Sequence, residues 1–552
     1  MATEGHNSDA LWFHHRVREL RAKGFSWAQV VEVLALDRKA SPLRLYRLAH
    51  GRSAADVVDE INQRDPAATA TLRLQRLYDY ETWPDGGRRP SVWALPVLAR
   101  IYQTSARRLV TDAVYASYSA ADQTDLDAAD FSHLDLHNPR RSPSAFGYSP
   151  ASAEPSDETG PHPVPPWQNG SQGDDADGLA QLVSPSSEES VALFRAVVQL
   201  EADPHRQETL FKLALGLGGV SGLPLVHKLS PDEWERLAAI TGNPARADLA
   251  TVQILSNVTE MCRHLDDSRG PEPVLKAMLR YRALVAKMLR ETPRSGLWQR
   301  LVQVYAELSQ FTGWLLYDLA NYAAADRHFK EGLAAAQEAR DIRTIAHIHC
   351  CLTHMAAYRG EIPTALDHAF AARGWANQTG SPLLASYAEQ LAAWTFAEEG
   401  WERASSQAML RAQQLLPDAP GDADPSYLYF VDRGFTAGFA AGCWRRLGRP
   451  KQALRDSEDG IALTDPMLPR NRGFRMLDRA GALVAQKEIG EAAQVATAIA
   501  EIATSHSSVR LTRWLLDLRA RLEPWAGRPE LRQLDARLAE LHITAPSRRA
   551  IR

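Results

Sequence analysis

Residues 319–333 read LANYAAADRHFKEGL, and a related pattern returns four times farther along the chain. The later stretches are RGEIPTALDHAFAA (359–372), EGWERASSQAMLRA (399–412), LGRPKQALRDSEDGI (447–461) and IGEAAQVATAIAEI (489–502). Each predicts a tight turn followed by a helix that starts with small or apolar residues. The expected turns are at Ala320, Gly360, Gly400, Gly448 and Gly490. Because one helix pair cannot bury its apolar side alone, the repetition predicts a stack of such pairs.

Alanine follows the first four of these turns, at Ala325, Ala365, Ala404 and Ala453, where a small side chain lets neighbouring helices approach closely. The pattern resembles tetratricopeptide repeats over roughly Leu301–Leu522. The resemblance implies an α-solenoid whose first helices line a concave, peptide-binding groove. We therefore expect a tetratricopeptide-like repeat domain at 301–545, preceded at 189–300 by a helical cap region.

Aromatic residues on the predicted first helices are the candidates for that groove. They are Trp314, Tyr317, Tyr387 and Trp394, with Tyr427 and Tyr429 nearby. Large aromatic side chains also fill cores, so core packing is the alternative for each of them. His347, Cys351 and His354 share one helical stripe and could ligate zinc. Buried cysteine more often acts as a small apolar residue, and the sequence predicts no metal site here.

Residues 118–188 are rich in Ser, Pro, Asp, Gly and Ala and carry a net charge of −10. They include PSDETGPHPVPPWQNGSQGDDADG at 155–178. Such a composition cannot bury enough apolar surface to offset the entropy of ordering. It predicts a disordered acidic linker that spaces two domains, although the acidic run could also compete with DNA for a basic surface.

The N-terminal segment 1–117 has a net charge of +4 and reads as a series of short helices. Its characteristic stretches are QRLYDYE (75–81), GGRRPS (86–91) and VWALPVLARIYQTSARRLV (92–110). On these, residues 43–110 resemble the Cro/repressor-like helix-turn-helix domain. Its first three helices correspond to Leu43–His50, Ser53–Arg64 and a recognition helix at Thr71–Glu81. Joined to tetratricopeptide-like repeats, this arrangement resembles a group of actinobacterial transcription regulators, which implies a DNA-binding regulator.

On a helical wheel, Leu74, Leu77 and Tyr78 share a face that we expect to pack against the domain. The expected base contacts are Thr71, Arg73, Gln75 and Arg76. Arginine can form two hydrogen bonds with guanine, and glutamine can do so with adenine. The expected phosphate contacts are Arg88 and Arg89. Asp79 and the long connection DPAATA (65–70) favour an alternative, an adaptor protein whose head and repeats both bind protein partners.

The remaining composition narrows the class of protein. The four cysteines form no Cys-x-x-Cys pair, residues 1–10 lack an apolar run, and Thr209–Val226 is interrupted by glycines and Pro224. A cytoplasmic protein without a membrane span is therefore expected. Nucleophile-elbow, His-Glu-x-x-His and Walker motifs are missing, so we predict no enzyme activity, catalytic residue or cofactor. The expected partners are double-stranded DNA, a second copy of the chain in a homodimer, and a peptide or protein in the groove.

Overall fold

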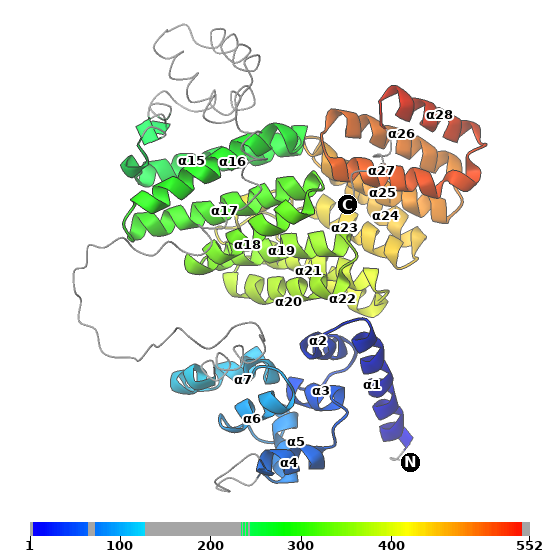
Figure 1. Cartoon of the computed structure of the whole chain (residues 1–552). Helices are drawn as coiled ribbons and strands as arrows, with labels where there is room; N and C mark the ends of the chain where they lie inside the picture. The colour runs from blue at the N-terminus through cyan, green and yellow to red at the C-terminus, as the bar shows by residue number, and fades with distance from the viewer. Residues whose placement is uncertain are drawn as a thin grey trace. The chain divides into compact units, whose positions relative to one another are not determined.

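The computed structural model describes residues 4–63, 72–126 and 243–543, together with 233, 236, 237, 239 and 240. Every regular element in these ranges is a helix, which confirms the expected all-α class for the described part of the chain. The chain divides into two compact units, Met1–Gly160 and Pro161–Arg552 (Figure 1). Thr71, the connection 65–70, most of the predicted linker (127–188) and the start of the predicted cap (189–232) lie outside the described residues.

The described residues 4–63 and 72–126, called the head below, form short helices. They are α1 (Glu4–Ala22), α2 (Trp27–Asp37), α3 (Pro42–Ala49), α4 (Ala54–Gln63), α5 (Leu74–Thr82), α6 (Ala94–Ile101), η1 (Arg107–Leu109) and α7 (Asp112–Ala116). Ser26 begins α2 with a reciprocal capping box, and Ser41 accepts a hydrogen bond from Arg44 N at the start of α3. These caps satisfy amide groups that a helix cannot satisfy itself. Helix α3 packs against α1, α2 and α5.

The head continues past the expected boundary at residue 117. Residues 120–126 are helical, and Leu126 is completely buried. The Tyr118 hydroxyl donates a hydrogen bond to the carbonyl of Pro90, at 2.6 Å. The first nine residues of the predicted linker are therefore part of the folded head.

The described residues 243–543, called the body below, contain longer helices that follow one another in pairs (Figure 1). They are η5 (Pro244–Arg246), α15 (Leu249–Arg269), α16 (Glu272–Glu291), α17 (Gly296–Asp318), α18 (Tyr322–Glu338), α19 (Ile342–Tyr358), α20 (Ile362–Thr379), α21 (Pro382–Glu398), α22 (Glu402–Leu415), η6 (Ser426–Leu428), α23 (Arg433–Arg446), α24 (Pro450–Leu463), α25 (Pro469–Ala485), α26 (Ile489–Ser505), α27 (Val509–Arg521), η7 (Glu523–Trp525) and α28 (Pro529–Glu540). Each helix from α17 to α26 packs on its partner in a pair and on the next pair. The expected start of the repeats at 301 falls inside α17.

Four of the five expected turns lie where the repeat spacing predicts them. Ala320, Gly360, Gly400 and Gly448 adopt left-handed backbone conformations, with φ of 61°, 73°, 72° and 69°. The fifth expectation, Gly490, is wrong. Lys487 has φ of 66° there, and Gly490 lies inside α26, because the buried Ile489 already begins that helix.

The two ends of the body meet. Helix α15 packs on α25, and the Ser507 amide, between α26 and α27, donates to the Arg269 carbonyl at the end of α15 (3.2 Å). A ring nitrogen of His506 lies 3.0 Å from the Asp266 carbonyl. The stack of helix pairs therefore closes on itself, and the first helices of the pairs surround an interior space.

Candidate functional site

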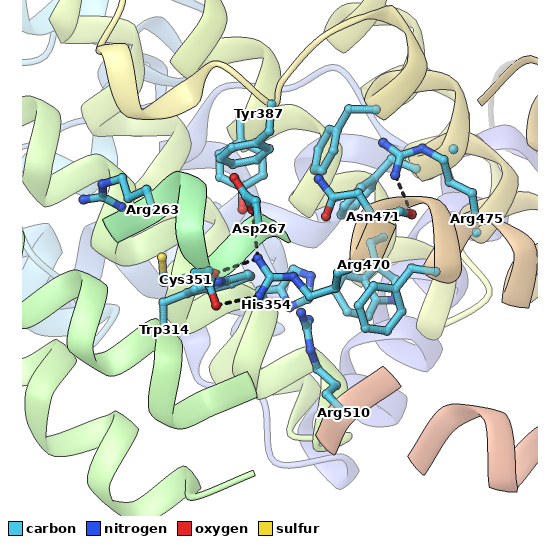
Figure 2. Close-up of a pocket in the computed structure, with 18 of the residues that line it drawn as sticks. Arg263, Asp267, Trp314, Cys351, His354, Tyr387, Arg470, Asn471, Arg475 and Arg510 are labelled. Carbon is cyan, nitrogen blue, oxygen red and sulfur yellow. Dashed lines mark hydrogen bonds and ion pairs between the residues drawn. The ribbon is translucent and has the colours of Figure 1, made fainter. Parts of the chain in front are cut away.

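The interior space of the body is a cavity of about 140 Å³. Its wall comes from α15, α17, α19, α21, α23, α25 and α27, together with the segment 427–430 (Figure 2). The aromatic lining residues are Phe311, Trp314, Tyr387, Trp394, Tyr427, Tyr429, Phe430, Phe435, Phe439, Phe474 and Trp514. Five arginines and three aspartates complete the wall with polar groups. Such a concave, mostly apolar site with a few placed charges is the usual form of a small-ligand pocket.

Three of the four expected groove residues, Trp314, Tyr387 and Trp394, line this cavity. Tyr387 and Trp394 are only 2% and 5% exposed, so little of either side chain is accessible to solvent. Tyr317 is absent from the lining and is fully buried. Its hydroxyl lies 2.8 Å from His354 Nδ1 and accepts a hydrogen bond from Arg510, which makes it part of the packing behind the wall.

His347, Cys351 and His354, which share one stripe of α19, also line the cavity. Burial lowers the pKa of His347 to about 3 and that of His354 well below its ordinary value. Burial raises the pKa of Cys351 to about 12, and Gln310 donates to its Sγ at 3.2 Å. All three are thus neutral near pH 7. Within the described ranges no three His, Cys, Asp or Glu side chains are grouped to hold a metal ion.

A buried ionic network joins the ends of the body beside the cavity. It comprises Arg470, Arg510, Asp266, Asp267 and Asp318, called the Arg470 cluster below. Arg470 lies 2.9 Å from Asp266, 3.1 Å from Asp267 and 3.3 Å from Asp318, and Arg510 lies 2.9 Å from Asp318 (Figure 2 shows both arginines and Asp267). The partners stand 152 to 204 positions apart in the chain, so these contacts fix the ring closure.

The aspartates of the Arg470 cluster differ in protonation. Burial raises the pKa of Asp266 to about 7, although Arg470 acts against it. Burial also acts to raise the pKa of Asp318, but Arg470 and Arg510 together hold it below its ordinary value.

Arg475 is the cavity arginine without a carboxylate at ion-pair distance in the described part of the chain. It is 6% exposed and donates to the backbone carbonyls of Gly434 (3.1 Å) and Asn471 (2.7 Å; Figure 2). Its guanidinium lies 5.4 Å from the centre of the Phe435 ring. Burial lowers the pKa of Arg475 to about 10, which still leaves it charged near neutral pH.

Glycine in α23 creates the space that Arg475 occupies. A Cβ at Gly438 would lie 2.5 Å from Arg475 Cγ and 2.6 Å from its Nε. Gly434, Gly438 and Gly442 recur every four residues and so share one face of α23. The side chains of α25 therefore reach across this face toward the cavity.

In the head, three of the four expected base-contacting residues, Arg73, Gln75 and Arg76, lie on or beside α5, and Thr71 lies outside the described residues. Arg73 and Gln75 are exposed, and Arg76 is half-buried. The expected packing face of α5 is confirmed at Leu77 and wrong at Leu74 and Tyr78. The buried residues are Leu77, Tyr80 and Glu81, whereas Leu74 and Tyr78 are each 43% exposed. The helix is rotated from the wheel prediction because a buried ion pair of Glu81 fixes it.

That ion pair joins α5 to α3. Arg47 Nε and Nη2 contact the two carboxylate oxygens of Glu81 at 2.5 and 2.8 Å, and both side chains are buried. Ser41, the cap of α3, donates to the Glu81 carbonyl at 2.6 Å. Arg88 and Arg89, the expected phosphate contacts, are exposed, and Arg89 lies over the Tyr118 ring at 4.5 Å.

The sequence alone did not identify Arg475, the Arg470 cluster or the Arg47–Glu81 pair. A usable signal was the glycine spacing of α23, which predicts a close approach by long side chains.

No known protein family and no curated protein matches the chain. None of the helices in the described ranges has the length and apolarity needed to cross a membrane.

Proposed function

We propose that the chain is a cytoplasmic DNA-binding transcription regulator whose tetratricopeptide-like body senses a ligand through its cavity. The proposal for the head rests on helix α5. It is fixed to α3 by the buried Arg47–Glu81 pair, and its outer side carries exposed polar residues. A rigid helix with an exposed polar face, held behind two bracing helices, is how helix-turn-helix domains present a reading helix.

Arg73, Gln75 and the half-buried Arg76 then supply the base readout, and Arg88 and Arg89 supply phosphate contacts. Arg73 precedes the first turn of α5, close to the end that enters the groove in such domains. The exposed Leu74 and Tyr78 add apolar surface that suits thymine methyl groups. Regulators of this design read two half-sites as dimers, so we also propose a homodimer.

The exposed apolar side chains support a second function. Leu74 and Tyr78 (each 43% exposed) and Trp93 (42% exposed) are the exposed large apolar residues of the described head. An apolar patch on a surface marks a protein-docking site in many soluble proteins. In this alternative the chain is an adaptor, and α5 binds a protein partner in place of DNA.

The deciding experiment selects fragments bound by the full chain from random and genomic DNA. The selected site is then titrated at several salt concentrations with wild type, Arg73→Ala, Arg76→Ala and the control Arg18→Ala. Arg18 is an exposed arginine of α1, outside the proposed interface. A base contact should cost about 1–3 kcal/mol on the selected site and little on random DNA.

Equal losses on both DNAs would make Arg73 and Arg76 phosphate contacts. No enrichment of any DNA, or no effect of either substitution, would favour the adaptor. Sedimentation of the full chain tests the homodimer separately, because a monomer at the concentration of half-maximal DNA binding would contradict it.

A further inference from the structure

The cavity wall contains one arginine, Arg475, that forms no ion pair within the described part of the chain. Asp432 and Asp478 are the acids that act on Arg475, and both have other partners. Asp432 accepts the Phe435 amide at the start of α23 (2.6 Å), and Asp478 lies 2.7 Å from Arg445. Burying a cation is costly unless it is paired, so this position favours an anion.

The donors of Arg475 are only partly used. Its Nε and Nη1 each donate to a backbone carbonyl, whereas a guanidinium has five N–H groups in a planar fork. The remaining N–H groups suit a carboxylate, which can accept two parallel hydrogen bonds. Asn471 lies one helical turn earlier in α25 and also lines the cavity. Its side-chain amide can donate to the same anion.

The rest of the wall favours an aromatic ring. Phe435 and Phe439 of α23 lie close together, with ring centres 5.4 Å apart, and Trp394 lies 5.8 Å from Phe439. Tyr387 lies 5.9 Å from Phe435. Aromatic rings pack edge-to-face or offset at such separations. A flat ligand next to Arg475 would therefore meet ring faces and edges on several sides.

The size of the cavity favours a small molecule over a peptide as its ligand. Its volume of about 140 Å³ is close to that of an engineered apolar cavity of about 150 Å³ that binds benzene. A helical or extended peptide needs far more room. The space accommodates one six-membered ring with a short acidic substituent.

We propose that this cavity binds a single-ring aromatic carboxylate, with the carboxylate on Arg475 and Asn471 and the ring among Tyr387, Trp394, Phe435 and Phe439. The regulatory role of this ligand rests on the proposed function, whereas the binding of the ligand does not. The other cavity arginines already have acidic partners: Arg263 has Glu307, Arg446 has Glu398, and Arg470 and Arg510 share the aspartates of the Arg470 cluster. Arg475 is therefore the anchoring residue.

The test is calorimetric titration of the full chain with benzoate, benzyl alcohol, benzylammonium and acetate. Concentrations reach about 10 mM, because a ligand of few atoms binds with limited affinity. Benzoate should bind one per chain, at least tenfold more tightly than benzyl alcohol and acetate, and benzylammonium should not bind. Equal binding of benzoate and benzyl alcohol would overturn the carboxylate anchor. Tighter binding of a short peptide that ends in phenylalanine would overturn the single-ring ligand.

Variants of α25 locate the site. Arg475→Met should weaken benzoate at least tenfold, and Arg475→Lys should weaken it less. Arg479→Met is the matched control, since Arg479 lies one turn farther along α25, pairs with Glu491 and is absent from the cavity wall. An unchanged affinity in a folded Arg475→Met chain would refute the proposal.

Asn471→Asp is a second test of the site that does not depend on whether the Arg475 variants fold. A carboxylate at 471 should pair with Arg475, raise the thermal midpoint and lower benzoate affinity at least tenfold. A higher midpoint with unchanged benzoate binding would overturn the site. None of these measurements uses DNA, so a failure of DNA binding and a failure of ligand binding are distinguishable.

Discussion

Two aspartates of the Arg470 cluster should respond in opposite ways to loss of their charge. Asp318 is completely buried between Arg470 and Arg510, 3.3 and 2.9 Å away, and its pKa is held below its ordinary value. Removing one partner of a buried ion pair costs about 3–5 kcal/mol. We therefore expect Asp318→Asn to lower the free energy of unfolding by about that amount at pH 7–8.

Asp266 should behave differently, because burial raises its pKa to about 7. A folded-state pKa above the unfolded value contributes stability at low pH, and that contribution is lost as the pH rises toward the folded pKa. The loss falls between the unfolded-state pKa of roughly 4 and the folded-state pKa of about 7. Asparagine resembles the protonated acid, so Asp266→Asn should remove this dependence and become more stable relative to wild type as the pH rises.

Urea unfolding of the full chain between pH 5 and 8.5, followed by circular dichroism, measures both effects. The head contributes equally to every variant. Asp326→Asn is the control, since Asp326 pairs with Lys330 on a partly exposed face of α18. Equal costs for Asp266→Asn and Asp318→Asn, or a pH trend for Asp266→Asn that matches wild type, would refute the assignment of the proton to Asp266.

Packing is tested by one substitution in each unit, Glu81→Leu in the head and Gly438→Ala in the body, each with a comparison variant. Glu81→Leu should lower the stability of the head by about 3–5 kcal/mol, because it leaves Arg47 buried and unpaired. Adding Arg47→Met should restore much of this stability in thermal unfolding. A double variant that is no more stable than Glu81→Leu alone would contradict the prediction. Gly438→Ala should lower the stability of the body by about 1–3 kcal/mol, because the added Cβ would lie 2.5 Å from Arg475 Cγ. Gly374 lies inside α20, where an added Cβ meets no atom within 4 Å, so Gly374→Ala should raise the stability by about 0.5–1 kcal/mol. Equal effects of the two alanines in urea unfolding would mean that Arg475 moves aside without cost.

The repeat register was predictable from the sequence because turn residues carry a local signal. Gly360, Gly400 and Gly448 need a left-handed backbone, and that requirement is visible in the residue type. Lys487 adopts the same conformation without glycine, so the fifth turn gave no such signal and was predicted three residues late. Local patterns therefore located the helices but misplaced a turn that has no glycine to mark it.

The cavity chemistry was less predictable, because it depends on residues far apart in the chain. Trp314, Tyr387 and Trp394 were found from their helical positions alone. The role of Arg475 requires knowing which carboxylates lie near it, and pattern reasoning does not supply that. The rotation of α5 has the same origin, since Glu81 reads as polar but is buried by Arg47.

The contact of α15 with α25 and with the segment 506–507 changes how the body can unfold. An open array of helix pairs frays from its terminal repeats, because each repeat touches only its neighbours and its stability adds up along one dimension. In this chain α15 contacts α25 and the segment 506–507 through Arg269, His506 and Ser507, so α15 is not a free terminal helix. Unfolding of α15 cannot begin without breaking these contacts with the C-terminal part of the body. The body should consequently melt as one cooperative unit, with hydrogen exchange in α15 and α25 slowed together.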